Sequence, residues 1–236
     1  MKIDSNCIEE LISVIESDQT IFGCSCLQNN WTGNNILFAG IALEIGNIKD
    51  WFPLIHINTT KVRNHSIEIP WGNGANLMVR RDKFFQIGGF DEKFYLDCED
   101  LDICWRAWMR GWKTIFVPKA IVYHKVGVVT KSFLKNRKNY HLMRLIGFEK
   151  NFLRFIIKTM SKKMIILIIF SKLFQIIGAL LIKSMIAKGI FIAFIKNLLE
   201  LKGTFLLRKK VMNSAKNSSD YLLNKFINNK ITLHKA

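Results

Sequence analysis

The stretch Gly88-Gly-Phe-Asp-Glu-Lys-Phe-Tyr-Leu-Asp-Cys-Glu-Asp-Leu-Asp102 places six carboxylates directly after a glycine pair. The chain of 236 residues has 18 Asp and Glu, and a third of them fall within residues 91–102. Packing alone rarely explains such a cluster, because carboxylates this close repel one another and raise each other's pKa. It indicates a metal, a cationic partner or acid–base chemistry, and we interpret it as part of a catalytic site.

A helix is predicted to begin at Glu99, because apolar residues then recur at helical spacing and Gly111 follows its expected end. Glu99 and Asp100 lie in the first turn, where the helix dipole favours a charged carboxylate. They are candidate general bases, and capping of the helix is the structural alternative. Asp102 has Arg106 one turn later, so an ion pair within the helix explains that residue.

A glycine-punctuated turn, residues 70–76, precedes an apolar strand at residues 77–79. Glycines let the backbone approach a ligand closely, and Trp71 beside them could stack on a sugar or a base. An ordinary tight turn fits the same residues equally well. Further along, residues 113–124 predict two short strands, or one strand and its continuation around Pro118, that end at His124. An isolated histidine of this kind is more often structural than a ligand.

The first 45 residues predict one helix followed by two strands. Ile8, Leu11, Ile12 and Ile15 repeat at the spacing of an amphipathic helix that ends near residue 17. Residues 20–25 and 36–43 have the branched and aromatic content of strands, with a turn between them.

Four motifs in this order resemble the family 2 glycosyltransferases, in particular their rhamnosyltransferase-like subgroup. They are Gly74-Ala-Asn-Leu-Met-Val-Arg-Arg81, Ile87-Gly-Gly-Phe-Asp-Glu-Lys-Phe94, Glu99-Asp-Leu-Asp-Ile-Cys-Trp-Arg106 and Pro118-Lys-Ala-Ile-Val-Tyr-His124. The matches cover roughly residues 70–127. The resemblance implies a partial GT-A sandwich, an α/β fold, over residues 1–127. It also implies a reaction in which a nucleotide-sugar gives its sugar, with inversion, to a glycan or lipid-linked acceptor.

The resemblance also implies roles for individual residues. Asp100 matches the catalytic base, with Glu99 beside it. His124 matches a histidine that in some members helps to hold a divalent metal, Mn²⁺ or Mg²⁺. Such an assignment is chemically coherent, because an attacking alcohol needs a base and a departing diphosphate needs a metal.

Four further residues are assigned to substrate binding by the same resemblance, and Trp71 is a candidate from the turn itself. Gly74 and Ala75 match the turn that lines the donor sugar, with Trp71 next to it. Asp91 and Glu92 match the loop on the acceptor side.

In the family, a nucleotide-binding half that ends in a metal-holding DxD motif precedes the helix predicted here at residues 8–17. No such motif precedes this helix in the sequence, and we expect that half to be missing, with an upstream-encoded polypeptide as a possible source of it. The alternative reading is a non-catalytic fragment, or one subunit of a split glycosyltransferase, that acts as a membrane-associated binding module.

The charge of the chain is strongly asymmetric. Residues 1–102 carry 8 Lys and Arg against 15 Asp and Glu, a net of −7, whereas residues 103–236 carry 27 against 3, a net of +24. The basic part contains long apolar runs rather than the polar and stacking residues of nucleic-acid binders, so we expect an anionic membrane surface as partner and no nucleic acid.

Residues 128–212 are expected to form a helical, membrane-associated region, followed by a polar flexible tail at residues 213–236. The run 164–182 is just long enough to span a bilayer, but Lys172 within it would be costly there, so helices lying in the interface are favoured over a span. The five cysteines show no metal-type spacing and no CxxC pair, which indicates reduced thiols. The predicted location is the cytoplasmic side of the cell membrane, with peripheral attachment.

Overall fold

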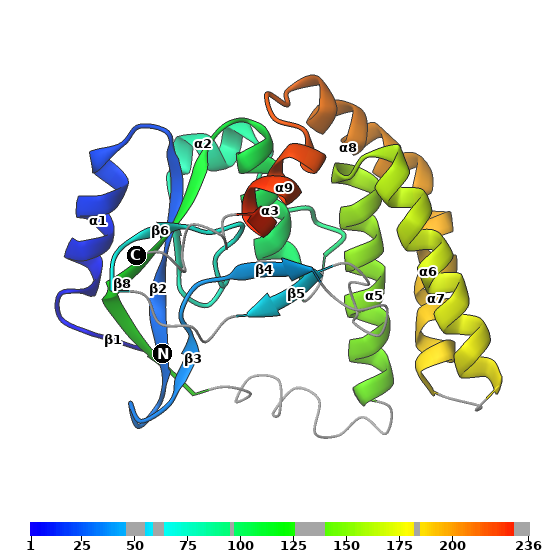
Figure 1. Cartoon of the computed structure of the whole chain (residues 1–236), viewed down its shortest axis with the longest axis horizontal. Helices are drawn as coiled ribbons and strands as arrows, with labels where there is room; N and C mark the ends of the chain where they lie inside the picture. The colour runs from blue at the N-terminus through cyan, green and yellow to red at the C-terminus, as the bar shows by residue number, and fades with distance from the viewer. Residues whose placement is uncertain (46–54, 59–63, 95–96, 126–139, 182–184, 229–236) are drawn as a thin grey trace. The chain divides into compact units, whose positions relative to one another are not determined.

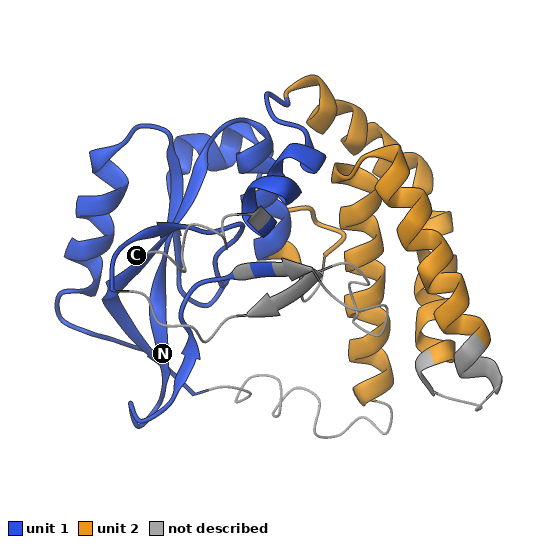
Figure 2. Ribbon diagram, in the orientation of Figure 1, with its two compact units in different colours: residues 1–89, 100–126, 215–236 blue, residues 90–99, 127–214 orange. Residues whose placement is uncertain are grey.

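The computed structural model divides the chain into two compact units (Figures 1 and 2). The residues that it describes are 1–45, 55–58, 64–94, 97–125, 140–181 and 185–228. Unit 1 comprises residues 1–89, 100–126 and 215–236, and unit 2 comprises residues 90–99 and 127–214. The segment that precedes Asp100 therefore belongs to a different unit from Asp100 itself.

A six-stranded mixed sheet forms the centre of unit 1, with the strand order β1, β8, β2, β3 (Figure 1). The bounds of its strands are β1 Lys2–Ile3, β2 Ile21–Asn30, β3 Ile36–Phe38, β6 Ile67–Glu68, β7 Leu77–Val79 and β8 Lys113–His124. β2 and β8 are parallel, and β1, β3, β6 and β7 pair antiparallel with one or the other.

The pairing of β2 with β8 is interrupted at Pro118. Cys26 lies opposite Val117, but the next residue of β2, Leu27, lies opposite Ile121, so residues 118–120 have no counterpart on β2. Proline has no N–H to donate and cannot continue a central ladder. The prediction of a strand that continues around Pro118 and ends at His124 is confirmed.

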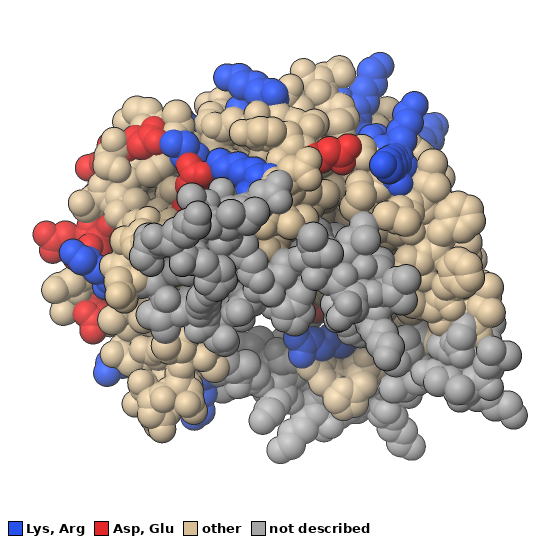
Figure 3. Space-filling model, viewed as in Figure 1, with Lys and Arg blue, Asp and Glu red and all other residues tan. Residues whose placement is uncertain are grey.

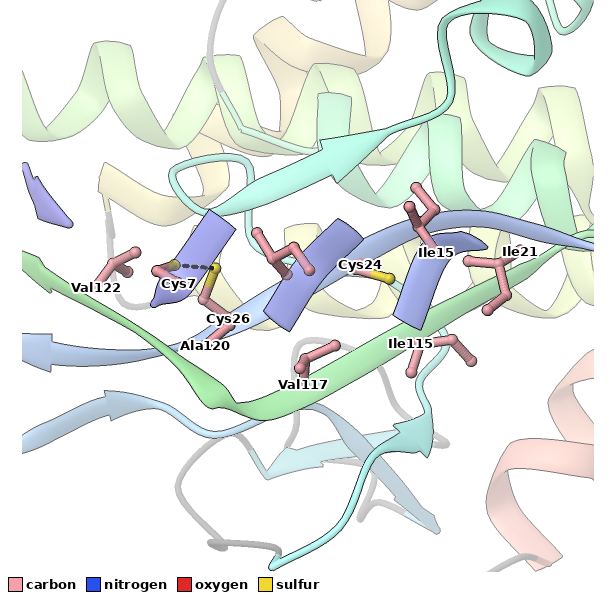
Figure 4. Packing of buried hydrophobic residues seen from close by; sticks show 10 residues of the cluster. Cys7, Ile15, Ile21, Cys24, Cys26, Ile115, Val117, Ala120 and Val122 are labelled. Carbon is pink, nitrogen blue, oxygen red and sulfur yellow. Dashed lines mark hydrogen bonds between the residues drawn. The ribbon is translucent and has the colours of Figure 1, made fainter. Parts of the chain in front are cut away.

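Helix α1 (Cys7–Ser17) packs on one face of this sheet. The buried residues of α1, β2 and β8 form one apolar cluster: Cys7, Leu11, Ile15, Ile21, Cys24, Cys26, Ile115, Val117, Ala120 and Val122 (Figure 4). Cys7 Sγ lies 3.7 Å from Cys26 Sγ. The predicted helix is confirmed, and Leu11 and Ile15 are buried as expected, but Ile8 and Ile12 are exposed. Cys7 takes their place at the sheet.

Helices α2 (Arg81–Gln86) and α3 (Glu99–Met109) pack against a second apolar cluster of unit 1. Phe22 of β2 and Ile103, Cys104 and Ala107 of α3 are its buried members. The predicted helix from Glu99 is confirmed. All five cysteines of the chain are free and buried. Burial raises the pKa of the Cys104 thiol to about 12, which keeps that thiol neutral.

The predicted strand over residues 36–43 is broken in the structure. β3 ends at Phe38, and the chain resumes as β4 (Ala42–Ile45), which pairs with β5 (Ile55–Asn58). Gly40, between β3 and β4, has φ +90°, and a Cβ there would lie 3.2 Å from Cγ of Phe116. A glycine with left-handed backbone redirects the chain where a continuous strand was expected.

The C-terminal segment returns to unit 1 as helix α9 (Ser219–Asn228). The ring of Phe226 meets that of Trp108 edge-on at 5.0 Å, and Trp105 Nε1–H donates to Ser219 Oγ at 3.0 Å. The expectation of a flexible tail over residues 213–236 is therefore wrong for residues 219–228. The segment is polar on average, but its few apolar side chains share one face and are buried.

Apart from the segment before Glu99, unit 2 is mainly helical in the part that the structure describes. Its helices are α5 Tyr140–Thr159, α6 Lys162–Leu181, α7 Met185–Leu199 and α8 Leu201–Asn213. α7 and α8 pack against α5, and residues 151–160 are all buried. Among the described residues, no helix combines the length and apolar character needed to cross a membrane.

Candidate active site

The carboxylate of Asp100 lies at the start of α3 and is held by two backbone N–H groups. Gly74 N–H donates to Asp100 Oδ2 at 2.9 Å, and Leu101 N–H donates to Asp100 Oδ1 at 2.7 Å. Backbone donors and the positive end of a helix dipole both favour a charged carboxylate. The structure thus brings together Asp100 and Gly74, which are 26 residues apart and were assigned to the base and to the donor turn.

The turn that carries Gly74 is fastened to β2 by side chains that the sequence analysis did not single out. Ser25 Oγ–H donates to Asn76 Oδ1 at 2.5 Å, and Asn73 N–H donates to Ser25 Oγ at 3.3 Å. Asn76 Nδ2–H donates to the carbonyl of Cys26 at 3.2 Å and to Gln28 Oε1 at 3.1 Å. Ser25, Gln28 and Asn76 are buried. A buried network of this kind fixes the turn because each lost bond would leave a polar group unsatisfied.

Gly72 allows this turn to lie against the sheet. A Cβ on Gly72 would lie 2.7 Å from Cδ1 of Leu77 and 2.9 Å from Cβ of Ser25, closer than such atoms pack. Ala75 N–H donates to Asn73 Oδ1 at 2.9 Å, so the backbone turns tightly here. Trp71 is half-buried and packs against the cluster around Phe22. Its expected stacking on a ligand stays a prediction.

Arg106 ties α3 to the glycine pair after α2. Its Nη2 and Nε lie 2.7 and 2.9 Å from Asp102 Oδ2, which confirms the predicted ion pair within the helix. Its Nη1 donates to the carbonyl of Ile87 at 2.6 Å, and Nη2 donates to that of Gly89 at 2.7 Å. Both partners are buried, so Asp102 orients Arg106 and has a structural role.

Asp91 and Glu92 lie in unit 2, and the structure gives them different surroundings. Arg154 Nε donates to Asp91 Oδ2 at 2.9 Å and its Nη2 to Oδ1 at 3.1 Å, while Lys158 Nζ lies 2.8 Å from Oδ2. Burial raises the pKa of the Asp91 carboxyl, but Arg154 and Lys158 outweigh this and hold that pKa well below its usual range. The side chain of Glu92 is exposed. Contact of either carboxylate with an acceptor stays a prediction.

The segment before α3 has an unusual backbone. Asp97 and Cys98 have φ values of 66° and 70°, in the left-handed region that residues other than glycine rarely adopt. Asn151 of α5 holds this conformation, because its Nδ2–H donates to the carbonyl of Asp97 at 3.0 Å. Strained residues of this kind cluster at functional sites and persist only where neighbours fix them. No sequence pattern signals either torsion angle.

His124 ends β8, opposite Asn30 of β2. Its Nδ1 is buried and makes no hydrogen bond to the described residues. Such a nitrogen could accept a metal, but no group of three or more His, Cys, Asp or Glu in the described part of the chain is placed to hold one. The described residues therefore supply one candidate ligand and do not form a metal site by themselves.

Unit 1 is thus a mixed sheet covered by helices. It carries a candidate acid–base site, the half-buried carboxylate of Asp100 held by a glycine turn. The chain belongs to the glycosyl transferase family group 2, whose family model matches residues 2–207.

Two kinds of curated relative share part of the sequence. The chain is 39% identical over 71 residues to the N-acetylglucosaminyl-diphospho-decaprenol L-rhamnosyltransferase of Mycobacterium tuberculosis, a stretch that covers 28% of this chain and 23% of the relative. It is 30% identical over 93 residues to rhamnosyltransferase WbbL of Escherichia coli, which covers 38% of this chain and 35% of that protein. The chain thus matches well under half the length of these relatives.

A crystal structure of GalNAc-T7 with UDP, GalNAc and Mn²⁺ is similar over 68% of this chain and 30% of that chain. The sequence identity is 19% and the TM-score is 0.45, which is too low to assign the fold or the site.

Proposed function

We propose that the chain carries the acceptor side of a glycosyltransferase of the GT-A fold. In this reaction a sugar passes from a nucleotide-sugar to a glycan or lipid-linked acceptor. The family membership supports the reaction class, and the two rhamnosyltransferase relatives favour rhamnose as the sugar. The assignment of the active site rests on one observation: the Asp100 carboxylate at the start of α3 accepts a hydrogen bond from Gly74 N–H at 2.9 Å.

Asp100 would act as general base for the acceptor. Its carboxylate takes the proton of an acceptor hydroxyl while the hydroxyl oxygen forms a bond to the anomeric carbon of the sugar. The bond from that carbon to the diphosphate breaks, and the nucleoside diphosphate leaves with the electron pair. Attack from the face opposite the leaving group inverts the anomeric configuration. A positioned base of this kind typically contributes about 10²–10⁴-fold to the rate.

A bound divalent cation would stabilise the departing diphosphate. His124 would be one ligand of this cation, and oxygens of the diphosphate itself would be others. Asp91, Arg154 and Lys158 lie in unit 2 as a buried ion cluster that fixes the segment leading to Asp100.

The proposal is tested by incubating the purified chain with a labelled nucleotide-rhamnose, an N-acetylglucosaminyl-diphospho-polyprenol and Mn²⁺, and following transfer of label to the lipid. We expect transfer that EDTA abolishes and Mn²⁺ restores, with an inverted anomeric centre in the product. If transfer occurs only when a separate nucleotide-binding half is added, the chain is one subunit of a split enzyme. Absence of transfer under both conditions contradicts the proposal and favours a binding module.

A further inference from the structure

The helices of unit 2 bury charged side chains and expose apolar ones. Glu149, Arg154, Lys158 and Lys172 are each at most 4% exposed. Phe174 of α6 is 73% exposed and Leu199 at the end of α7 is 82% exposed. Water-soluble helices show the opposite distribution, with charges outside and apolar residues inside. Charged residues that face the interior of a helical bundle are typical of proteins in contact with lipid.

Helix α6 shows this inversion most clearly. On its inward face, Lys172 Nζ lies 3.0 Å from Glu149 Oε1 of α5 and 3.2 Å from Gln175 Oε1. On the opposite face, large apolar side chains recur at i, i+4, i+8 and i+11 and are exposed: Ile166, Phe170, Phe174 and Ile177. Lys172 therefore has a partner inside unit 2, and the cost expected for a charge within this apolar run does not arise.

Helix α7 repeats the pattern beside α6. Asn197 is buried, and its Nδ2–H donates to the carbonyls of Lys150 and Ala193, both at 3.0 Å. Its exposed large apolar residues recur at i, i+4, i+7 and i+8, next to the exposed Lys188 and Lys196: Phe191, Ile195, Leu198 and Leu199. α6 and α7 pack against each other in the same unit, so the two stripes belong to neighbouring helices. We call these eight residues of α6 and α7 the apolar stripes.

Soluble proteins rarely leave such contiguous apolar surface uncovered, and a patch of this kind marks a contact with a partner or with lipid. The charge around the apolar stripes favours lipid over a protein partner. Residues 162–213 contain ten Lys and Arg and a single acid, Glu200. Glu200 is engaged within unit 2, where its Oε2 lies 3.3 Å from Lys150 Nζ.

Most of the exposed lysines lie near helix ends. Lys162 and Lys163 form the first turn of α6, Lys188 and Lys196 lie towards the two ends of α7, and Lys202, Lys209 and Lys210 lie on α8. Figure 3 shows Lys and Arg gathered over α8 and the start of α6, while the visible surface along the rest of α6 carries none. Apolar residues bordered by lysines match the acyl chains and anionic headgroups of a bilayer.

We propose that unit 2 docks on an anionic lipid bilayer, with the apolar stripes among the acyl chains and the lysines of α6, α7 and α8 on the headgroup phosphates. The proposal rests on the proposed function in one respect, since a lipid-linked acceptor puts the site at a membrane. It depends otherwise only on contacts within unit 2. Vesicle binding and sugar transfer are separate measurements, so failure of one does not imply failure of the other.

The test is flotation of the full chain with vesicles of phosphatidylcholine, with and without phosphatidylglycerol. The wild type should float with the anionic vesicles. The variant Phe170→Ser/Phe174→Ser/Ile177→Ser should lose at least about tenfold in vesicle affinity, because three exposed apolar side chains supply much of the buried area. Phe85→Ser is the matched control, since Phe85 is an exposed aromatic residue of α2 in unit 1. Equal melting temperatures show that all three proteins fold.

A second variant tests the charge. Lys202→Gln/Lys209→Gln/Lys210→Gln should remove most of the preference for anionic vesicles, whereas Lys119→Gln, an exposed lysine of β8, should keep it. A wild type that stays with the soluble fraction overturns the proposal, and so does a triple serine variant that floats like the wild type. Sedimentation that shows a dimer which the serine substitutions dissociate would assign the apolar stripes to a second copy of the chain instead.

Discussion

Gly72 decides how closely the turn of the candidate site can approach β2. A methyl group there would meet Ser25 and Leu77 at less than 3 Å, and Ser25 is itself bonded to Asn73 and Asn76. The position of Gly74, whose N–H holds Asp100, therefore depends on a residue that takes no part in the chemistry.

We predict that Gly72→Ala destabilises unit 1 by about 1–3 kcal/mol, since an added group in a packed site forces its neighbours to move. Sugar transfer should fall together with stability, because the turn that holds Asp100 moves. The control is Gly147→Ala in α5, where a Cβ would meet nothing within 4 Å. That substitution should leave stability unchanged or raise it by about 0.5–1 kcal/mol, as helical Gly-to-Ala changes do. Thermal unfolding of both variants measures the difference, and equal destabilisation would refute the explanation.

Helix α5 organises the segment that leads into the candidate site. Arg154 and Lys158 neutralise Asp91, and Asn151 fixes the left-handed Asp97. The low pKa of Asp91 also makes the stability of unit 2 depend on pH. A carboxyl whose pKa is lower in the folded state stabilises fully above its unfolded pKa, about 3.9, and loses this contribution as the pH falls towards the folded value.

Asp91→Asn should therefore cost about 3–5 kcal/mol at pH 7, where it leaves two buried cations without a counterion. The stability of wild type and variant should converge as the pH falls below about 4. Glu92→Gln, at the exposed neighbouring position, should behave as wild type throughout. Denaturant unfolding across this pH range gives the comparison. A constant difference between wild type and Asp91→Asn would show that the ion cluster is not its cause.

The elements that the sequence predicted are those whose local pattern is strong. Apolar periodicity located α1 and α3, and Pro118 located the interruption of β8. Contacts between distant residues were not predictable. α9 forms because its apolar face meets Trp105 and Trp108, and neither a polar average composition nor local spacing reveals that partner.

The candidate site shows the same contrast between local patterns, which were predictable, and contacts between distant residues, which were not. The motif that contains Asp100 was recognisable, as was the Asp102–Arg106 pair one helical turn apart. The network of Ser25 and Asn76 was not, because its members lie 51 residues apart and small polar residues are common in turns. Asp91 was expected at an acceptor surface, and only the structure reveals the buried cations around it.

At the scale of the whole molecule, the chain combines an acidic N-terminal portion that carries Asp100 with a basic helical portion that exposes apolar stripes. Membership of the glycosyl transferase family group 2 connects the first to sugar transfer. The basic helical portion would bind the membrane in which a lipid-linked acceptor is embedded. The central claim is that Asp100 is the base of that transfer.

The most direct test is the initial rate of sugar transfer by the wild type, Asp100→Asn and Asp82→Asn under identical conditions. Asn keeps the size of the side chain and can still accept the Gly74 N–H, but it cannot take a proton at neutral pH. We predict a rate about 10²–10⁴-fold below wild type for Asp100→Asn and a wild-type rate for Asp82→Asn, the exposed control on α2. An Asp100→Asn variant that transfers sugar at the wild-type rate would contradict the account.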